Sequence, residues 1–103
     1  MTEERFMNHI NIIRNYLTEN LTACAVGFID PHDEKDAQGP TRSFLISCPN
    51  QDEKRVCFTR DFIQQNPADL PMILNRLELA RYILHETFLE IEVNTHRIKN
   101  FYR

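Results

Sequence analysis

The chain has 103 residues, of which 42% are hydrophobic and 26% charged, and a formal net charge of −3. This length is common for one domain around one core, and the acidic balance argues against a surface that binds nucleic acid or anionic lipid throughout. The longest apolar run, residues 23–29, is too short to cross a bilayer, and the acidic start of the chain is unlike a secretory signal. We therefore expect one cytoplasmic domain over residues 1–103.

The N-terminal part of the chain predicts a helix, a strand and a loop. Apolar residues fall on one stripe of a helical projection over residues 3–19, which indicates an amphipathic helix. Residues 22–29 are apolar at both parities, a pattern typical of a central strand covered on both faces. Residues 30–41 hold two Pro, a Gly and several charges, and we interpret them as a solvated loop because the spacing of a calcium-binding loop is absent.

The next two segments, residues 42–48 and 55–59, predict strands that form a hairpin. A slip of one residue in their pairing would exchange the two faces, so two assignments are open. In either register, both faces of the sheet are expected to be apolar. The preferred register places Phe44, Ile46, Cys48 and Cys57 on one side and Leu45, Val56 and Phe58 on the other.

Residues 70–86 carry the strongest helix pattern, with no Gly and with Pro71 in the first turn, where a missing N–H costs nothing. Thr59 is expected to cap a short helical turn that precedes this helix, and Asp69 to cap the helix itself. The helix has two apolar sides, and only one of them can cover a sheet. The first side consists of Leu70, Ile73, Leu74, Leu77, Ala80 and Leu84, and the second of Met72, Leu79 and Ile83.

Beyond residue 86 the apolar period changes from helical to alternating. Residues 89–93 therefore predict a strand with one wet face, although a continued helix also fits the spacing. Asn94 or Thr95 then caps a short terminal helix. The fold class is α+β: an N-terminal helix, a three-stranded antiparallel meander, a long helix, a fourth strand and a short C-terminal helix, with the helices packed on a small sheet.

No catalytic, metal-binding or cofactor-binding motif is complete. Cys24, Cys48 and Cys57 lack the CxxC spacing and are interpreted as reduced side chains on strands. His85 begins a zincin motif, but Leu89 stands where the second His belongs. We therefore assign no cofactor, no metal and no catalytic residue. A small enzyme is an alternative, and its candidate groups are Cys57, His85, Glu90 and Glu92.

The C-terminal residues are basic and aromatic and include no acid. Such a mixture can bind phosphate and stack on bases, so nucleic-acid binding is a second alternative. Basic residues near the end of a helix are equally normal as partners of the helix dipole. The residues concerned are His96, Arg97, Lys99, Phe101, Tyr102 and Arg103.

The order of elements, the size and the acidity are similar to those of the small dimeric chaperones that hold type III secretion effectors, although this chain is shorter and is expected to lack their fifth strand. We favour a non-catalytic, cytosolic interaction or regulatory protein that acts as a homodimer, because the expected apolar surface exceeds what two helices can cover. Contacts with a partner are assigned to Met72, Leu79, Ile83, Arg97, Lys99 and Tyr102.

Overall fold

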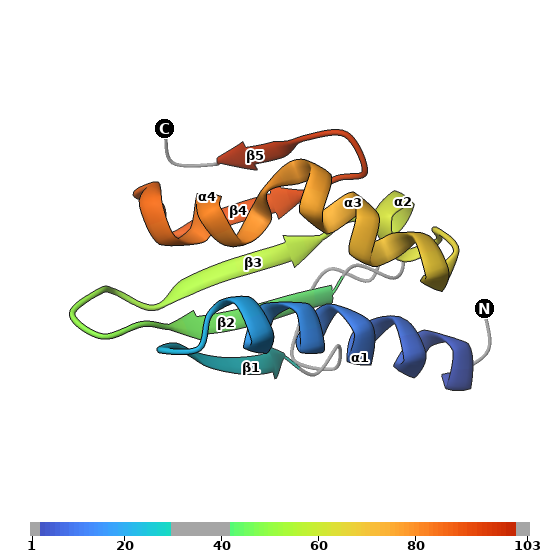
Figure 1. Cartoon of the computed structure of the whole chain (residues 1–103), viewed down its shortest axis with the longest axis horizontal. Helices are drawn as coiled ribbons and strands as arrows, with labels where there is room; N and C mark the ends of the chain where they lie inside the picture. The colour runs from blue at the N-terminus through green and yellow to red at the C-terminus, as the bar shows by residue number, and fades with distance from the viewer. Residues whose placement is uncertain (1–2, 30–41, 101–103) are drawn as a thin grey trace.

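The computed structural model of the protein describes residues 3–29 and 42–100 (Figure 1). The loop expected over residues 30–41 lies outside the described residues. No helix within the described ranges has the length and apolar content that crossing a membrane requires. The elements in chain order are α1 (Glu3–Asn20), β1 (Ala25–Ile29), β2 (Arg42–Ser47), β3 (Lys54–Phe58), α2 (Arg60–Ile63), a 3-10 turn (Pro67–Asp69), α3 (Leu70–Leu77), α4 (Leu79–His85), β4 (Glu90–Val93) and β5 (Ile98–Asn100).

The strands form one mixed sheet in the order β1-β2-β3-β4-β5. Neighbouring strands are antiparallel except β3 and β4, which are parallel and joined by a crossover that contains α2, α3 and α4. The α+β class, the meander of the first three strands and the fourth strand agree with the prediction.

The expected C-terminal helix is wrong, because residues 98–100 form a fifth strand. Asn94 turns the chain back towards β4: its side-chain Oδ1 accepts the N–H of His96, and its own N–H donates to the carbonyl of Arg97. A short Asx-type turn of this kind competes with a helix start for the same side chain. The expectation that a fifth strand is missing is therefore also wrong.

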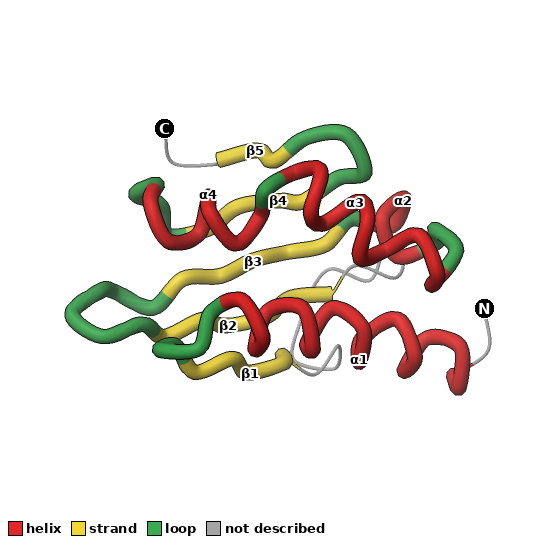
Figure 2. The backbone as a smooth tube through the Cα atoms, in the orientation of Figure 1, coloured by secondary structure: helices red, strands yellow, loops and turns green. Residues whose placement is uncertain are grey.

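The helices α1, α3 and α4 all lie on one face of the sheet (Figure 2). The core fills the space between this helical layer and the sheet. The opposite face, which we call the open face, is mixed in polarity, so the expectation of a sheet apolar on both sides is wrong. The core face carries the fully buried Phe44, Ile46, Val56, Phe58, Ile91 and Val93, and the open face carries Leu45, Arg55, Cys57, Glu90, Glu92 and Lys99.

The predicted hairpin is present, but its preferred face assignment is wrong. Phe44 pairs with Val56, and Ser43 pairs with Cys57. The six-residue turn 48–53 sets this register, which is the one-residue slip that the pattern left open. Cys57 therefore lies on the open face, away from Phe44.

β1 is an edge strand, not the central strand expected from its apolar composition. Val26 and Phe28 are half-buried and pack against the core. Ala25 and Gly27 are exposed on the open face, as their shared parity predicts. Both faces of β1 carry apolar residues, but for different reasons. One face carries the core residues Val26 and Phe28, and the other carries the small residues Ala25 and Gly27.

Residues 70–86 form two helices, so the expected single helix is wrong. Glu78 lies between them with φ 53 and ψ 43, in the left-handed region, and this residue changes the direction in which the following side chains point. Tyr16 of α1 fills the break. Its hydroxyl donates to the carbonyl of Leu74 at 3.4 Å and accepts the N–H of Ala80 at 3.1 Å.

The predicted caps differ in outcome. The Thr59 side chain accepts the N–H of Phe62 and caps α2, as expected. The Asp69 side chain makes no capping hydrogen bond at the start of α3. Instead, Asn66 caps the preceding 3-10 turn through the N–H of Ala68. The chain therefore enters α3 directly from a helical turn.

Cys24 and Cys48 form a disulfide, so the prediction of three reduced cysteines is wrong for this pair. Ala25 pairs with Ser47 across β1 and β2, and the cysteines occupy the next opposed positions. Cys57 takes no part in the disulfide. Disulfides persist mainly in oxidising compartments, and the cytoplasmic location stays a prediction.

Candidate functional site

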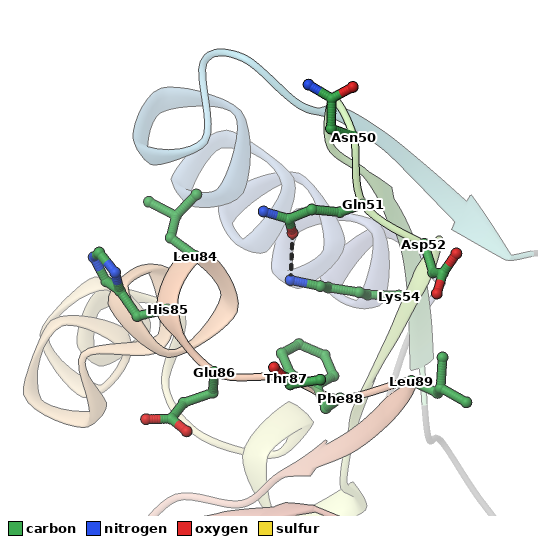
Figure 3. A pocket seen from close by; sticks show the side chains of 10 residues that line it. All are labelled: Asn50, Gln51, Asp52, Lys54, Leu84, His85, Glu86, Thr87, Phe88 and Leu89. Carbon is green, nitrogen blue, oxygen red and sulfur yellow. Dashed lines mark hydrogen bonds between the residues drawn. The ribbon is translucent and has the colours of Figure 1, made fainter.

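A hollow of about 690 Å³ lies between the turn that joins β2 to β3 and the connection from α4 to β4 (Figure 3). We call it the groove. Two segments that are distant in sequence meet here because β3 and β4 are neighbours and α4 ends beside them. Asn50 makes a tight turn possible by adopting φ 61, which Asn tolerates better than most residues. The lining residues are Asn50, Gln51, Asp52, Lys54, Leu84, His85, Glu86, Thr87, Phe88 and Leu89.

Lys54 is the buried cation of the groove, with an exposure of 6%. Its Nζ donates to Gln51 Oε1 and to the carbonyl of Ile83, each at 2.7 Å, and lies 5.0 Å from the centre of the Phe88 ring. The carbonyl of Ile83 belongs to the last turn of α4, where backbone acceptors lack helical partners and the dipole is negative. Lys54 therefore holds the end of this helix.

Burial also lowers the pKa of Lys54 below its usual value of 10.5. A lysine of lowered pKa can act as a nucleophilic amine when its nitrogen is available. Here two acceptors and an aromatic ring already surround the ammonium. The geometry thus assigns Lys54 a structural role at the floor of the groove.

The accessible parts of the groove include apolar and acidic side chains beside neutral polar ones. Leu84 is 43% exposed and Leu89 is 54% exposed, and the two lie on opposite sides of the groove in Figure 3. Asp52 and Glu86 are exposed and add two carboxylates. Such a surface suits an apolar group that has a positive charge beside it.

The structure separates the residues of α3 and α4 that were expected to face a partner. Leu79 and Ile83 are 0% exposed within the chain, so the expected outward ridge is wrong for both. The break at Glu78 turns them towards the core and turns Leu84, which was expected to cover the sheet, outwards. Met72 remains 58% exposed on α3, away from the residues that line the groove.

The four candidates for catalysis are not brought together. Cys57 lies on the open face between Ser43 and Glu92, and Glu90 shares that face. His85 lies at the end of α4, in the helical layer on the other side of the sheet. Within the described ranges, no three His, Cys, Asp or Glu side chains gather as a metal site would require.

The basic C-terminal residues are only partly within the described range. Arg97 and Lys99 are exposed, whereas Tyr102 lies outside it. Lys99 is the register partner of Glu92 on the neighbouring strand. A carboxylate beside this lysine reduces the local positive potential that phosphate binding needs.

Sequence reasoning missed the groove. Its two sides come from residues 50–54 and 84–89, which no local pattern connects. The available signal was the polar run His85-Glu86-Thr87, which interrupts the apolar pattern between Leu84 and Leu89. Leu84 turns outwards only because the helix changes direction at Glu78, and the sequence does not reveal that change.

Comparison of the chain with protein-family models, with curated proteins and with solved structures finds no significant match in any of the three.

Proposed function

We propose that this protein is a non-catalytic interaction domain whose groove binds a short basic and apolar segment of a partner protein. One observation carries the proposal. Among the described residues, three large hydrophobic side chains are exposed, and two of them, Leu84 and Leu89, lie on opposite sides of one groove. An apolar segment laid across the groove would cover both leucines and would itself leave water, which is the usual driving force of association.

The charges of the groove indicate the chemistry of the partner. Asp52 and Glu86 are exposed, whereas Lys54 is buried and its donors are engaged. A lysine or arginine beside the inserted apolar group is therefore attracted, and an acidic residue is repelled. The net charge of −3 acts in the same direction at long range.

The test uses two labelled peptides, one of alternating lysine and leucine and one of alternating glutamate and leucine. Fluorescence anisotropy is expected to show binding of the basic peptide and its weakening with salt. The variant Leu84→Glu should raise the Kd of the basic peptide at least about tenfold, because it places a charge in the apolar part of the contact. Glu86→Lys should weaken the basic peptide and strengthen the acidic one.

The matched control is Met72→Glu, which adds the same charge to an exposed hydrophobic position outside the groove. Its Kd should equal that of the unmodified protein. Equal binding of both peptides, or binding that Met72→Glu disrupts and Leu84→Glu does not, would reject the groove as the interaction site.

A further inference from the structure

The outer strands of the sheet, β1 and β5, differ in chemistry. β1 consists of five residues, Ala-Val-Gly-Phe-Ile, with neither charge nor proline. β5 has three residues and carries Lys99 at its centre. Natural proteins usually shorten, charge or interrupt an edge strand, because its bare backbone groups pair readily with another strand. Within the described residues, β1 has none of these protections.

Val26 and Phe28 direct their backbone N–H and C=O groups to the outer side of β1. The Cα atoms of Cys24 and Cys48 are 4.2 Å apart, which identifies a narrow, non-hydrogen-bonded position in the β1–β2 ladder. By alternation, Gly27 bonds to β2 and its two neighbours point outwards. No other strand of the described residues lies on this side. The N–H of Cys24 already donates to the carbonyl of Leu21, which ends the bare edge before Val26.

We propose that β1 pairs with β1 of a second copy of this chain, in an antiparallel register centred on Gly27. Val26 then faces Phe28 of the second copy, and the two exchange N–H and C=O groups. Gly27 faces its own counterpart at a narrow position, where the missing side chains let the strands approach. A two-fold axis perpendicular to the sheet generates this pairing and joins the two sheets into one.

The same two-fold axis keeps the helices of both copies on one face. Figure 1 shows α1 in front of β1 and β2, so the two α1 helices come to lie side by side above the joined strands. Val26 and Phe28 face this helical layer and are half-buried in the single chain. Each gains an apolar neighbour from the second copy, so the pairing extends the core as well as the hydrogen-bond ladder.

A second copy fits this edge better than an unrelated strand. The register is self-complementary: apolar Val26 meets apolar Phe28, and glycine meets glycine at the axis. No like charges oppose one another along the strand. The surface is also distinct from the groove, so the inference does not depend on the proposed function.

The test places charges at the proposed axis. A Cβ atom at Gly27 would have its nearest contact, the carbonyl of Leu45, at 3.9 Å, so the single chain has room for a side chain there. Light scattering of the disulfide-bonded protein at tens of micromolar should give twice the chain mass of 12.3 kDa. Gly27→Lys and Gly27→Glu should each give the mass of one chain, because like charges meet at the axis. An equimolar mixture of the two variants should restore the doubled mass.

The control is Ala25→Lys, on the same strand and the same exposed face but away from the axis. At the same concentration, a larger fraction of Ala25→Lys than of Gly27→Lys should have the doubled mass. A single-chain mass for the unmodified protein overturns the inference, and so does a dimer that survives both charged variants. Peptide binding at the groove is measured separately, so either result leaves the proposed function to its own test.

Discussion

Two helical segments of nearly equal length cover the sheet, and they are held in different ways. α1 is one unbroken helix, and it lies against the core through its own stripe of Ile10, Ile13 and Leu17. α3 and α4 together cover a similar length but are broken at Glu78. The apolar stripe of α1 is enough to explain how α1 packs. The α3–α4 segment depends in addition on side chains supplied by other elements.

α4 is held at both ends by such side chains. Tyr16 from α1 bonds the N–H of Ala80 at its start, and Lys54 from β3 bonds the carbonyl of Ile83 at its end. These contacts satisfy backbone groups that a continuous helix would satisfy internally. The groove depends on the break in the second segment, because the change of direction at Glu78 turns Leu84 outwards.

The largest expected effect is that of Leu79→Glu. Leu79 is 0% exposed, so the substitution buries an unpaired carboxylate and should cost more than about 4 kcal/mol of unfolding free energy. Circular dichroism should show loss of cooperative unfolding. Met72→Glu, on the exposed side of α3, should change the unfolding free energy by less than about 0.5 kcal/mol. A folded Leu79→Glu variant of unchanged stability would place Leu79 outside the core.

Tyr16→Phe tests the contact that fills the break. The change leaves the N–H of Ala80 without its acceptor and should cost about 1–3 kcal/mol in denaturant unfolding. Tyr82→Phe is the matched control, because that ring contacts Phe88 and no hydroxyl hydrogen bond is found for it among the described residues. Similar costs for the two variants would show that the Tyr16 hydroxyl has no special role.

Glu78→Gly tests the break by the sign of its effect. In a continuous helix this change should cost about 1 kcal/mol. At a left-handed residue it should instead raise the unfolding free energy by about 0.5 kcal/mol, because glycine adopts φ 53 without a Cβ clash. The exposed ion pair of Glu78 with Arg81, at 3.7 Å, contributes little. Asn15→Gly in unbroken α1 should lose about 0.5 kcal/mol under the same conditions.

The smallest expected effects are those of alkaline pH, and the two ends of α4 give opposite signs. Burial raises the pKa of Tyr16. Above pH 10 the unfolded chain therefore loses the hydroxyl proton before the folded chain does, and the Tyr16 contribution makes the unfolding free energy fall as pH rises. Burial lowers the pKa of Lys54. Below pH 10.5 the folded chain therefore loses the ammonium proton before the unfolded chain does, and the Lys54 contribution makes the unfolding free energy rise with pH.

Chemical unfolding between pH 8 and 11 separates the two contributions. Tyr16→Phe should remove the fall, and Lys54→Met should remove the rise. An unchanged pH profile in either variant would show that the group does not titrate differently in the folded and unfolded states.

The same comparison shows which features the sequence could predict. α1 was predictable because its apolar stripe lies on a single helix without a break. The segment 70–86 looked like a helix with two apolar sides, but Leu77 and Leu79 belong to one core face whose phase shifts at Glu78. The chain holds no Gly, Pro or Asn at the break, so no local signal marked it. The hydroxyl of Tyr16, which bonds α3 and α4 on either side of the break, comes from a distant part of the chain.

Features that join distant segments were beyond local patterns. The disulfide requires the β1–β2 pairing, because Cys24 and Cys48 meet only across those strands. The groove requires the parallel pairing of β3 with β4. The terminal strand β5 required the turn at Asn94 to compete successfully with a helix cap, and propensity alone does not decide between them.

The unequal edges of the sheet also decide how far assembly can proceed. A sheet with two adhesive edges can add copies without end, and the product is a fibre. Among the described residues, the β1 edge is apolar and pairs with no further strand, while the β5 edge carries Lys99. Once two copies have joined through β1, both remaining edges are of the charged kind. In the proposed pairing growth would stop at two chains, so a strand that would be an aggregation hazard on a symmetric sheet would give a finite assembly.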